Sequence, residues 1–322
     1  MLCTFCVVIL HQERGEVIVP VIPYFDHLDE GSFDLKYFSR SFLNRETVKF
    51  NAMVSNFNIQ LLASCQQKNN RLCLGLDIDP AKLPGQIGCD LDSMRSFSRD
   101  VVDATIDITP VYKLNLAFYE RLGSPGIDWL NELVQHIGDR AVTIADGKRG
   151  DIGNTSRQYA QALFNTMGFD AATISPYMGR DAVEPFLDHP DKGVFILCLT
   201  SNTGAQDFQY LRADGQFLYQ HVAQMAADLN IHQNVGLVVG ATQPQAMQDI
   251  RQRNTDLSWL VPGVGAQGGD LESAITIGNQ NSVAIINVSR GILYAGQGTI
   301  PDIAAAANDY TCQIRKFLTD NN

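Results

Sequence analysis

The chain of 322 residues has little positive charge and no long hydrophobic run. Its 24 Lys and Arg residues stand against 35 Asp and Glu residues, which gives a formal net charge of −11. Nucleic acids and anionic membranes are bound by basic surfaces, so this balance argues against both partners. The apolar stretch at residues 2–10 is too short to span a bilayer and has no basic start. We therefore expect a soluble globular protein in which any anionic ligand occupies a local cationic pocket.

Metal-binding and disulfide patterns are also missing. The six histidines show neither HxH nor HExxH spacing, so we expect no metal site. The seven cysteines are odd in number and scattered, and most stand in apolar runs, as is typical of reduced thiols in a cytoplasmic protein. Cys3 and Cys6 form a CxxC motif without a second pair, so zinc or redox chemistry is not expected there.

After residue 70 the sequence repeats one theme, a short β-branched apolar run followed by a helical segment. Such alternation predicts a parallel sheet buried on both faces, and eight units favour closure into a (β/α)8 TIM barrel. A doubly wound open sheet is the alternative fold, but no Gly-x-Gly-x-x-Gly follows the first run. The eight predicted strands cover residues 72–76, 111–116, 142–145, 171–174, 194–199, 235–239, 259–264 and 283–288.

The region before this repeat differs in composition. Residues 12–50 are mixed in charge and aromatic content and show no clear period, whereas a regular helical pattern begins at Met53. A single domain of about 250 residues is ordinary for an α/β barrel. We therefore predict an N-terminal appendage of unknown role over residues 1–52 and a (β/α)8 barrel catalytic domain over residues 53–322.

Three ionisable side chains, Asp146, Lys148 and Asp151, crowd into six residues at the end of the third predicted strand. Side chains in a strand alternate between faces, so a strand through residues 142–148 would point Asp146 and Lys148 the same way. Asp151 would lie just beyond the strand end. A solvated charge cluster is the alternative interpretation, because structural ion-pair networks also collect such groups.

Polar residues follow the other predicted strands as well. Because the carboxyl ends of barrel strands meet on one rim, where barrel enzymes carry their chemistry, we expect these residues to line one site. Glycines after the seventh and eighth strands would let backbone N–H groups approach a phosphate, which Arg290 could clamp and Gln267 could contact. The ligand is therefore expected to carry a phosphate. The rim residues are Asp77, Lys113, Asn115, Ser175, Gln267, Arg290 and Gly291.

The Asp-x-Lys-x-x-Asp motif at residues 146–151, with Thr155 four residues later, resembles the orotidine 5′-phosphate decarboxylase family. The segment Asp-Gly-Lys-Arg-Gly-Asp-Ile resembles the bacterial subgroup of the family. Further segments match the family and occur in the same order along the chain. They are Gly-Leu-Asp at 75–77, Tyr-Lys-Leu-Asn at 112–115, Ser-Pro-Tyr-Met-Gly at 175–179, Pro-Gly-Val-Gly-Ala-Gln-Gly-Gly at 262–269 and Val-Ser-Arg-Gly at 288–291. The resemblance covers roughly residues 55–318, and nothing before Met53 belongs to it.

The resemblance implies a homodimeric, cofactor-independent and metal-free lyase that converts orotidine 5′-monophosphate to UMP and CO2 in pyrimidine biosynthesis. It implies catalytic roles for Lys113, Asp146 and Lys148 of one chain, and for Asp151, which would reach with Thr155 into the neighbouring subunit's pocket. The implied substrate contacts are Asp77 and Lys113 with the ribose, Ser175 with the pyrimidine amide, and Gln267, Arg290 and Gly291 with the phosphate. Thr173, on the same strand face as Ser175, is an alternative for the pyrimidine contact.

Two other functions compete with this interpretation. Sugar-phosphate decarboxylases and aldolases of the same barrel superfamily share the Asp-x-Lys-x-x-Asp motif but hold magnesium with carboxylates, including an acid at the position of Lys113. A lysine there disfavours a metal. A nucleotide-binding protein on an inactive barrel would keep Gln267 and Arg290 but lose the central charges, and all four of those charges are present.

Overall fold

The computed structural model describes residues 6–12, 15–21, 56–85, 87–265 and 268–319. By its internal contacts the chain divides into two units, residues 1–55 and residues 56–322. In the first unit, strands β1 (Cys6–Gln12) and β2 (Gly15–Val21) pair antiparallel, with Cys6 opposite Val21. The separate role predicted for residues 1–52 stays a prediction.

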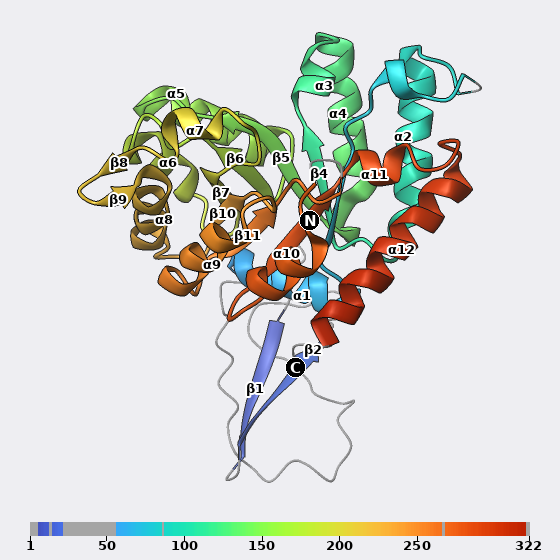
Figure 1. The fold of residues 1–322 in the computed structure, drawn as a ribbon. Coiled ribbons are helices and arrows are strands. Elements are labelled where there is room, and N and C mark those ends of the chain that lie inside the picture. The colour runs from blue at the N-terminus through green and yellow to red at the C-terminus, as the bar shows by residue number, and fades with distance from the viewer. Residues whose placement is uncertain (1–5, 13–14, 22–55, 86, 266–267, 320–322) are drawn as a thin grey trace, which may run out of the picture. The chain divides into compact units, whose positions relative to one another are not determined.

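The second unit is a closed barrel of eight parallel strands, as the sequence predicts (Figure 1). Neighbours in the barrel follow the order β3, β4, β5, β6, β7, β10, β11 and β12, and β12 pairs with β3. Each connection between sequential barrel strands carries helix, so every strand directs its carboxyl end to the same rim. The strands are β3 (Leu72–Gly75), β4 (Val111–Asn115), β5 (Val142–Arg149), β6 (Ala171–Ile174), β7 (Gly193–Leu199), β10 (Val235–Val239), β11 (Ser258–Val261) and β12 (Ala284–Val288).

Helices surround the barrel, and several begin at a residue whose side chain caps the helix. The Asp90 side chain accepts a hydrogen bond from Ser93 N at 3.0 Å, and Asp270 accepts one from Ser273 N at 2.7 Å. The α-helices are α1 (Phe57–Gln67), α2 (Leu91–Thr105), α3 (Ala117–Glu120), α4 (Ser124–Ile137), α5 (Gly153–Ala160), α6 (Arg180–Leu187), α7 (Ala205–Phe208), α8 (Leu218–Leu229), α9 (Pro244–Arg253), α10 (Leu271–Gly278), α11 (Arg290–Leu293) and α12 (Ile300–Thr319).

Short elements complete the second unit. They are the 3-10 turns Pro80–Lys82 and Gly138–Arg140, the π-helix Gln161–Thr166 that continues α5, and the hairpin of β8 (Arg212–Ala213) and β9 (Gln216–Phe217). The hairpin lies in the connection between α7 and α8, beyond the carboxyl end of β7.

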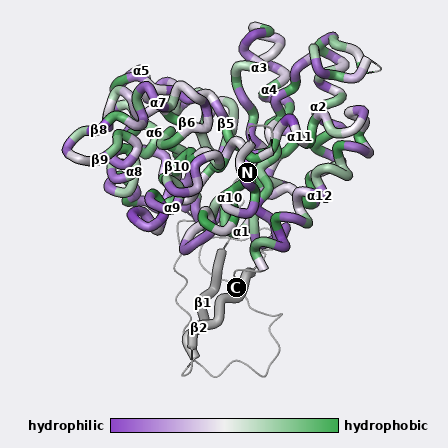
Figure 2. Tube along the Cα trace, in the orientation of Figure 1, coloured by the Kyte–Doolittle hydropathy of each residue, from purple (hydrophilic) through white to green (hydrophobic). Residues whose placement is uncertain are grey.

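Buried hydrophobic residues fill the barrel and the layer between the barrel and its helices. Along the outer helices, such as α12, hydrophobic and hydrophilic residues alternate as expected for amphipathic helices that bury one side (Figure 2). At the amino-terminal end of the barrel, Phe57 of α1 packs directly over Gly193, where a Cβ would come within 2.4 Å of its ring, and it meets Phe195 edge-on at 5.9 Å. Phe57 thus closes that end, and polar groups lie at the opposite rim.

Candidate active site

A row of alternating charges lies at the carboxyl ends of β3, β4 and β5. Lys113 Nζ is 2.9 Å from Asp146 Oδ2 and 3.6 Å from Asp77 Oδ1, and Lys148 Nζ is 2.6 Å from Asp146 Oδ1. The side chains of Lys113 and Asp146 are 5% and 10% exposed, whereas that of Lys148 is 48% exposed. The centre of the row is therefore buried, which distinguishes it from a solvated surface cluster, and its outer lysine faces open space.

The buried charges sustain one another. Burial alone raises the pKa of Asp146, but the ammonium groups of Lys113 and Lys148 outweigh it and hold that pKa below its ordinary value of 3.8. Burial likewise lowers the pKa of Lys113, and the carboxylates of Asp146 and Asp77 outweigh it, so the net shift of that pKa is upward from 10.5. Asp146 is thus an anion and Lys113 a cation throughout the neutral range.

Asp146 and Lys148 meet as the sequence predicts, but regular alternation is not the reason. The pairing of β5 with β6 shifts register between Ala145 and Arg149, and Lys148 adopts a left-handed backbone with φ of 46°. Thr173 of β6 lies opposite this irregular segment. Its hydroxyl accepts a hydrogen bond from Lys148 N at 3.0 Å and donates one to Asp146 Oδ1 at 2.9 Å. The Thr173 hydroxyl is therefore engaged within the charged row.

Asp151 and Thr155 lie beyond the end of β5. The Asp151 side chain is partly exposed and accepts a hydrogen bond from Ile152 N at 2.8 Å. Thr155 is exposed on α5. Within residues 56–85, 87–265 and 268–319, no ion pair involves Asp151. Asp151, the last residue of the motif, and Thr155 thus lie outside the charged row of their own chain.

Ser175 and Asp77 have different surroundings. Ser175 follows β6, and its backbone N–H donates to Arg149 O at 2.7 Å, which ties it to the end of β5. Oδ1 of Asp77 is buried and, among the described residues, accepts no hydrogen bond, although Lys113 Nζ lies 3.6 Å away. An unsatisfied buried carboxylate oxygen can accept a bond from a ligand hydroxyl. Asn115 is partly buried and its side chain accepts a bond from Ala117 N at 3.2 Å.

The predicted phosphate residues lie after β11 and β12. Arg290 is exposed at the start of α11, and Gly291 follows it. Gly263, Gly265 and Gly268 have positive φ values of 96°, 70° and 78°, which other residues rarely adopt. Gln267 lies outside the described residues. Three glycines of the turn after β11 thus have the left-handed backbone that favours glycine.

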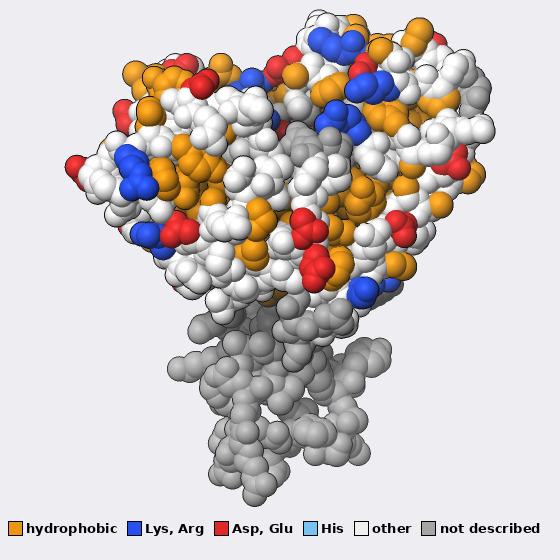
Figure 3. Space-filling view, in the orientation of Figure 1, with side chains coloured by type: hydrophobic (Ala, Val, Ile, Leu, Met, Phe, Trp, Pro, Cys, Tyr) orange, Lys and Arg blue, Asp and Glu red, His pale blue; other side chains and the backbone are white. Residues whose placement is uncertain are grey.

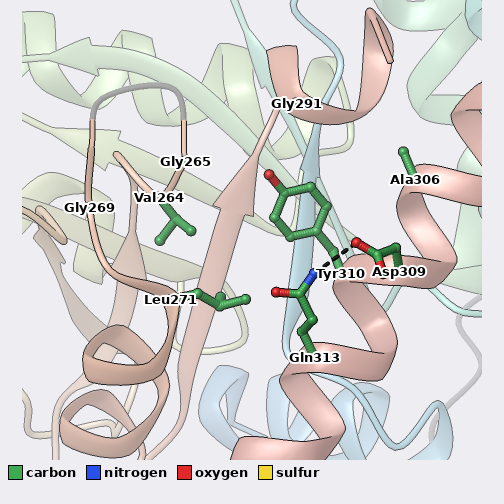
Figure 4. A pocket seen from close by; sticks show the side chains of 9 residues that line it. All are labelled: Val264, Gly265, Gly269, Leu271, Gly291, Ala306, Asp309, Tyr310 and Gln313. Carbon is green, nitrogen blue, oxygen red and sulfur yellow. Dashed lines mark hydrogen bonds between the residues drawn. The ribbon is translucent and has the colours of Figure 1, made fainter. Parts of the chain in front are cut away.

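A cavity of about 400 Å³ lies behind these loops, between the turn after β11 and helix α12 (Figure 4). Tyr310 of α12 projects into it from one side and Val264 and Leu271 from the other. The Tyr310 hydroxyl is close to both loops, because a Cβ built on Gly265 or Gly291 would lie 3.0 or 2.8 Å from it. Tyr310 was not among the residues expected from sequence, since it lies 19 positions after Gly291 on a helix with no motif.

Comparisons with known proteins identify the family of the chain. The sequence model described as "Orotidine 5′-phosphate decarboxylase / HUMPS family" matches residues 70–300. The orotidine 5′-phosphate decarboxylase of Roseiflexus castenholzii is 47% identical over 267 residues, covering 82% of this chain and 97% of the relative. That of Natronomonas pharaonis is 48% identical over 234 residues, covering 72% and 86%.

A solved structure has the same fold. The OMP decarboxylase of Leishmania donovani superposes with a TM-score of 0.72 and 35% identity, covering 82% of this chain and 98% of that one. The family match includes Asp77, Lys113, Asp146, Lys148 and Arg290. The chain belongs to the orotidine 5′-phosphate decarboxylase / HUMPS family.

Proposed function

We propose that the protein is an orotidine 5′-phosphate decarboxylase, which releases CO2 from orotidine 5′-monophosphate and forms UMP without a metal or cofactor. The observation that carries the proposal is the buried row Asp77, Lys113, Asp146 and Lys148, with a lysine ammonium at its open end. The names of relatives up to 48% identical support the same substrate. The activity would belong to pyrimidine biosynthesis, in the cytoplasm.

The chemistry requires a cation at the reacting carbon. Breaking the bond between C6 and the carboxylate leaves an electron pair in the ring plane, where the ring carbonyls cannot delocalise it. The Lys148 ammonium would stabilise this pair electrostatically and then transfer its proton to C6 as the general acid. Asp146, at 2.6 Å from Lys148 Nζ, would hold the ammonium in place.

Lys113 and Asp77 form the inner part of the charged row. Lys113 is the buried cation that keeps Asp146 ionised, and its second carboxylate partner is Asp77. The unsatisfied Oδ1 of Asp77 is suited to accept a ribose hydroxyl, with Lys113 donating to the sugar. Ser175 would contact the pyrimidine amide, and Thr173 is the weaker choice for that contact because its hydroxyl already serves Lys148 and Asp146.

The phosphate would bind far from the reacting carbon. Arg290 presents a planar fork of donors, and the glycine turn after β11, with Gln267 and Gly291, would supply further donors. A phosphate held there contributes binding energy that fixes the pyrimidine ring over Lys148. Loss of Arg290 is therefore expected to act on substrate affinity.

A second copy of the chain would complete the site. Asp151 has no ion pair within the described residues of its own chain. The exposed Lys148 of a second copy could form one with it. Large exposed hydrophobic side chains surround this rim after β5, β6 and β7, and Figure 3 shows hydrophobic side chains over α5. They include Ile152, Tyr177, Met178, Phe208 and Leu211, which are 47 to 81% exposed. A homodimer would cover them and bring Asp151 and Thr155 into the partner's pocket.

The direct experiment mixes purified protein with orotidine 5′-monophosphate and a chelator and follows UMP by chromatography. Conversion that persists with chelator supports the proposal. A folded dimer that forms no UMP would refute it. The magnesium-dependent sugar-phosphate function of related barrels is disfavoured by the Lys113 ammonium, which occupies the position between Asp77 and Asp146 where a metal would need a carboxylate.

Mixing variants tests the shared site. Lys148→Ala and Asp151→Ala subunits are each expected to be inactive alone. After mixing and subunit exchange, each heterodimer would have one site with both wild-type groups, so activity should return to about a quarter of the wild-type value if half of the dimers are mixed. Failure to recover activity in a mixture shown to contain heterodimers would refute sharing.

We also propose that residues 1–52 are dispensable for catalysis. The family match begins at residue 70, and the second compact unit begins at residue 56. Protein that starts at Met53 should remain folded and convert orotidylate at the rate of the full chain. Loss of folding or activity on this truncation would contradict the proposed domain boundary.

A further inference from the structure

Strands β5 and β6 lie side by side but do not pair regularly at the active-site end (Figure 1). Ala145 pairs with Ala172 and Arg149 pairs with Ile174, so a step of four residues on β5 faces a step of two on β6. The three intervening residues, Asp146 to Lys148, therefore stand opposite Thr173 alone. Such irregularities disrupt the backbone ladder and redirect side chains, and they are frequent beside active sites.

The Thr173 hydroxyl bridges the irregular segment. It accepts the Lys148 backbone N–H at 3.0 Å and donates to Asp146 Oδ1 at 2.9 Å. A hydroxyl has one donor and two acceptor positions, so the two bonds are compatible. Thr173 is 1% exposed, which keeps water from replacing either bond. One buried side chain thus holds the backbone of Lys148 and the carboxylate that contacts its ammonium.

The bond from the Lys148 N–H stabilises an otherwise unfavourable backbone conformation. Lys148 has φ of 46°, a region that side-chain-bearing L-residues avoid. The Thr173 hydroxyl gives the Lys148 N–H a buried hydrogen-bond acceptor where the backbone pairing of β5 with β6 is interrupted. Because threonine is branched at Cβ and has few χ1 states, its hydroxyl is directed more firmly than that of serine. The same Oδ1 receives the Lys148 ammonium at 2.6 Å, so displacement of either group would move the other.

We propose that Thr173 is a positioning residue for the active site, whose hydroxyl fixes the left-handed turn at Lys148 and the orientation of Asp146. This inference rests on the proposed decarboxylase function for its kinetic test. It assigns Thr173 to the charged row and leaves the pyrimidine contact to Ser175.

Thr173→Val is the main variant, because valine has nearly the shape of threonine without the hydroxyl, and Thr173→Ser is the matched control. We expect kcat of Thr173→Val to fall by about 10- to 100-fold, because a hydrogen bond to a charged group at the reacting centre is lost. KM for orotidylate should change by less than about threefold, since the phosphate and ribose contacts remain. Thr173→Ser should retain kcat within about threefold, since it keeps the hydroxyl.

A wild-type kcat in Thr173→Val would overturn the proposal. So would equal losses in Thr173→Val and Thr173→Ser, because the loss would then not depend on whether the hydroxyl is present. If Thr173→Val does not fold, Thr173→Ala removes the hydroxyl without placing a methyl group against the carboxylate, and the same comparison with Thr173→Ser applies.

Amide hydrogen exchange, followed by NMR, tests the bond without any activity. The Lys148 amide should exchange at least about tenfold faster in Thr173→Val than in the wild type, relative to the Ile144 amide, and not in Thr173→Ser. Unchanged exchange at Lys148 would refute the role of Thr173. If the wild-type protein did not convert orotidylate, the proposed function would fail, while this measurement would still decide the inference.

Discussion

Replacing Lys113 by methionine should destabilise the protein strongly, because Lys113 and its carboxylate partner Asp146 are buried. Lys113 is 5% exposed and lies 2.9 Å from Asp146 and 3.6 Å from Asp77. Methionine keeps most of the side-chain volume but leaves both carboxylates without their buried cation. Lys148 is then the cation that remains beside Asp146, and because its side chain is 48% exposed, solvent screens the attraction.

The expected loss follows from removing one member of a buried ion pair. Such removal costs about 3–5 kcal/mol, because the remaining charge stays buried without compensation. We expect Lys113→Met to lower the free energy of unfolding by about this amount at pH 7. Urea denaturation at fixed protein concentration, followed by circular dichroism, measures the difference.

Lys82→Met is the matched control. Lys82 Nζ also lies 3.6 Å from an aspartate, Asp79, but its side chain is 48% exposed. An exposed pair contributes about 0–1 kcal/mol, so this variant should unfold nearly as the wild type does. Equal effects of Lys113→Met and Lys82→Met would refute the argument that burial makes the central row important.

The pH dependence has a defined sign. In the wild type, the lowered pKa of Asp146 means that its stabilisation is present above pH 3.8 and is lost as pH falls through the lower folded pKa. The raised pKa of Lys113 means that its stabilisation is present below pH 10.5 and is lost as pH rises through the higher folded pKa. In Lys113→Met the pKa of Asp146 rises, so the folded variant binds more protons. The stability difference should therefore shrink from pH 8 to pH 5, and an unchanged difference would contradict the coupling.

Two further substitutions test separate parts of the molecule. Arg290→Ala should raise KM for orotidylate by about 10- to 100-fold with a smaller change in kcat, because a charged phosphate contact is lost; an unchanged KM would remove Arg290 from the phosphate site. Arg251→Met should lower the free energy of unfolding by about 2–4 kcal/mol, since Arg251 is fully buried, donates to Leu257 O at 2.8 Å and stacks 3.8 Å over Trp259. Denaturation of Arg253→Met, which removes an exposed arginine on the same helix, provides the comparison.

The barrel was predictable from sequence because its strands are short β-branched runs separated by helices of the expected length. Two of the predicted strands, at residues 171–174 and 235–239, have the observed bounds of β6 and β10. The strand predicted at residues 259–264 ends at Val261, because Pro262 cannot donate to the ladder. The strand predicted at residues 142–145 continues to Arg149, since polar residues can extend a strand beyond its apolar part.

The sequence identified the residues of the charged row but did not predict how they are arranged. Residue spacing placed Asp146 and Lys148 together, whereas the irregular pairing opposite Thr173 depends on a strand distant in sequence. The same limit applies to burial, because only the closed barrel shows that Lys113 is enclosed and Lys148 is open. Arg251 is another case, since a basic helix residue is ordinarily solvent-exposed and here binds backbone carbonyls inside the fold.

Single-turnover kinetics of Lys148→Ala test the central claim most directly. With enzyme in excess over orotidylate, loss of both the electrostatic stabilisation and the proton donor should slow UMP formation by at least about 10⁴-fold. UMP affinity, measured by calorimetry, should stay within about tenfold of the wild-type value. A rate above about one tenth of the wild-type rate would contradict the assignment of Lys148 as the group that stabilises and protonates C6.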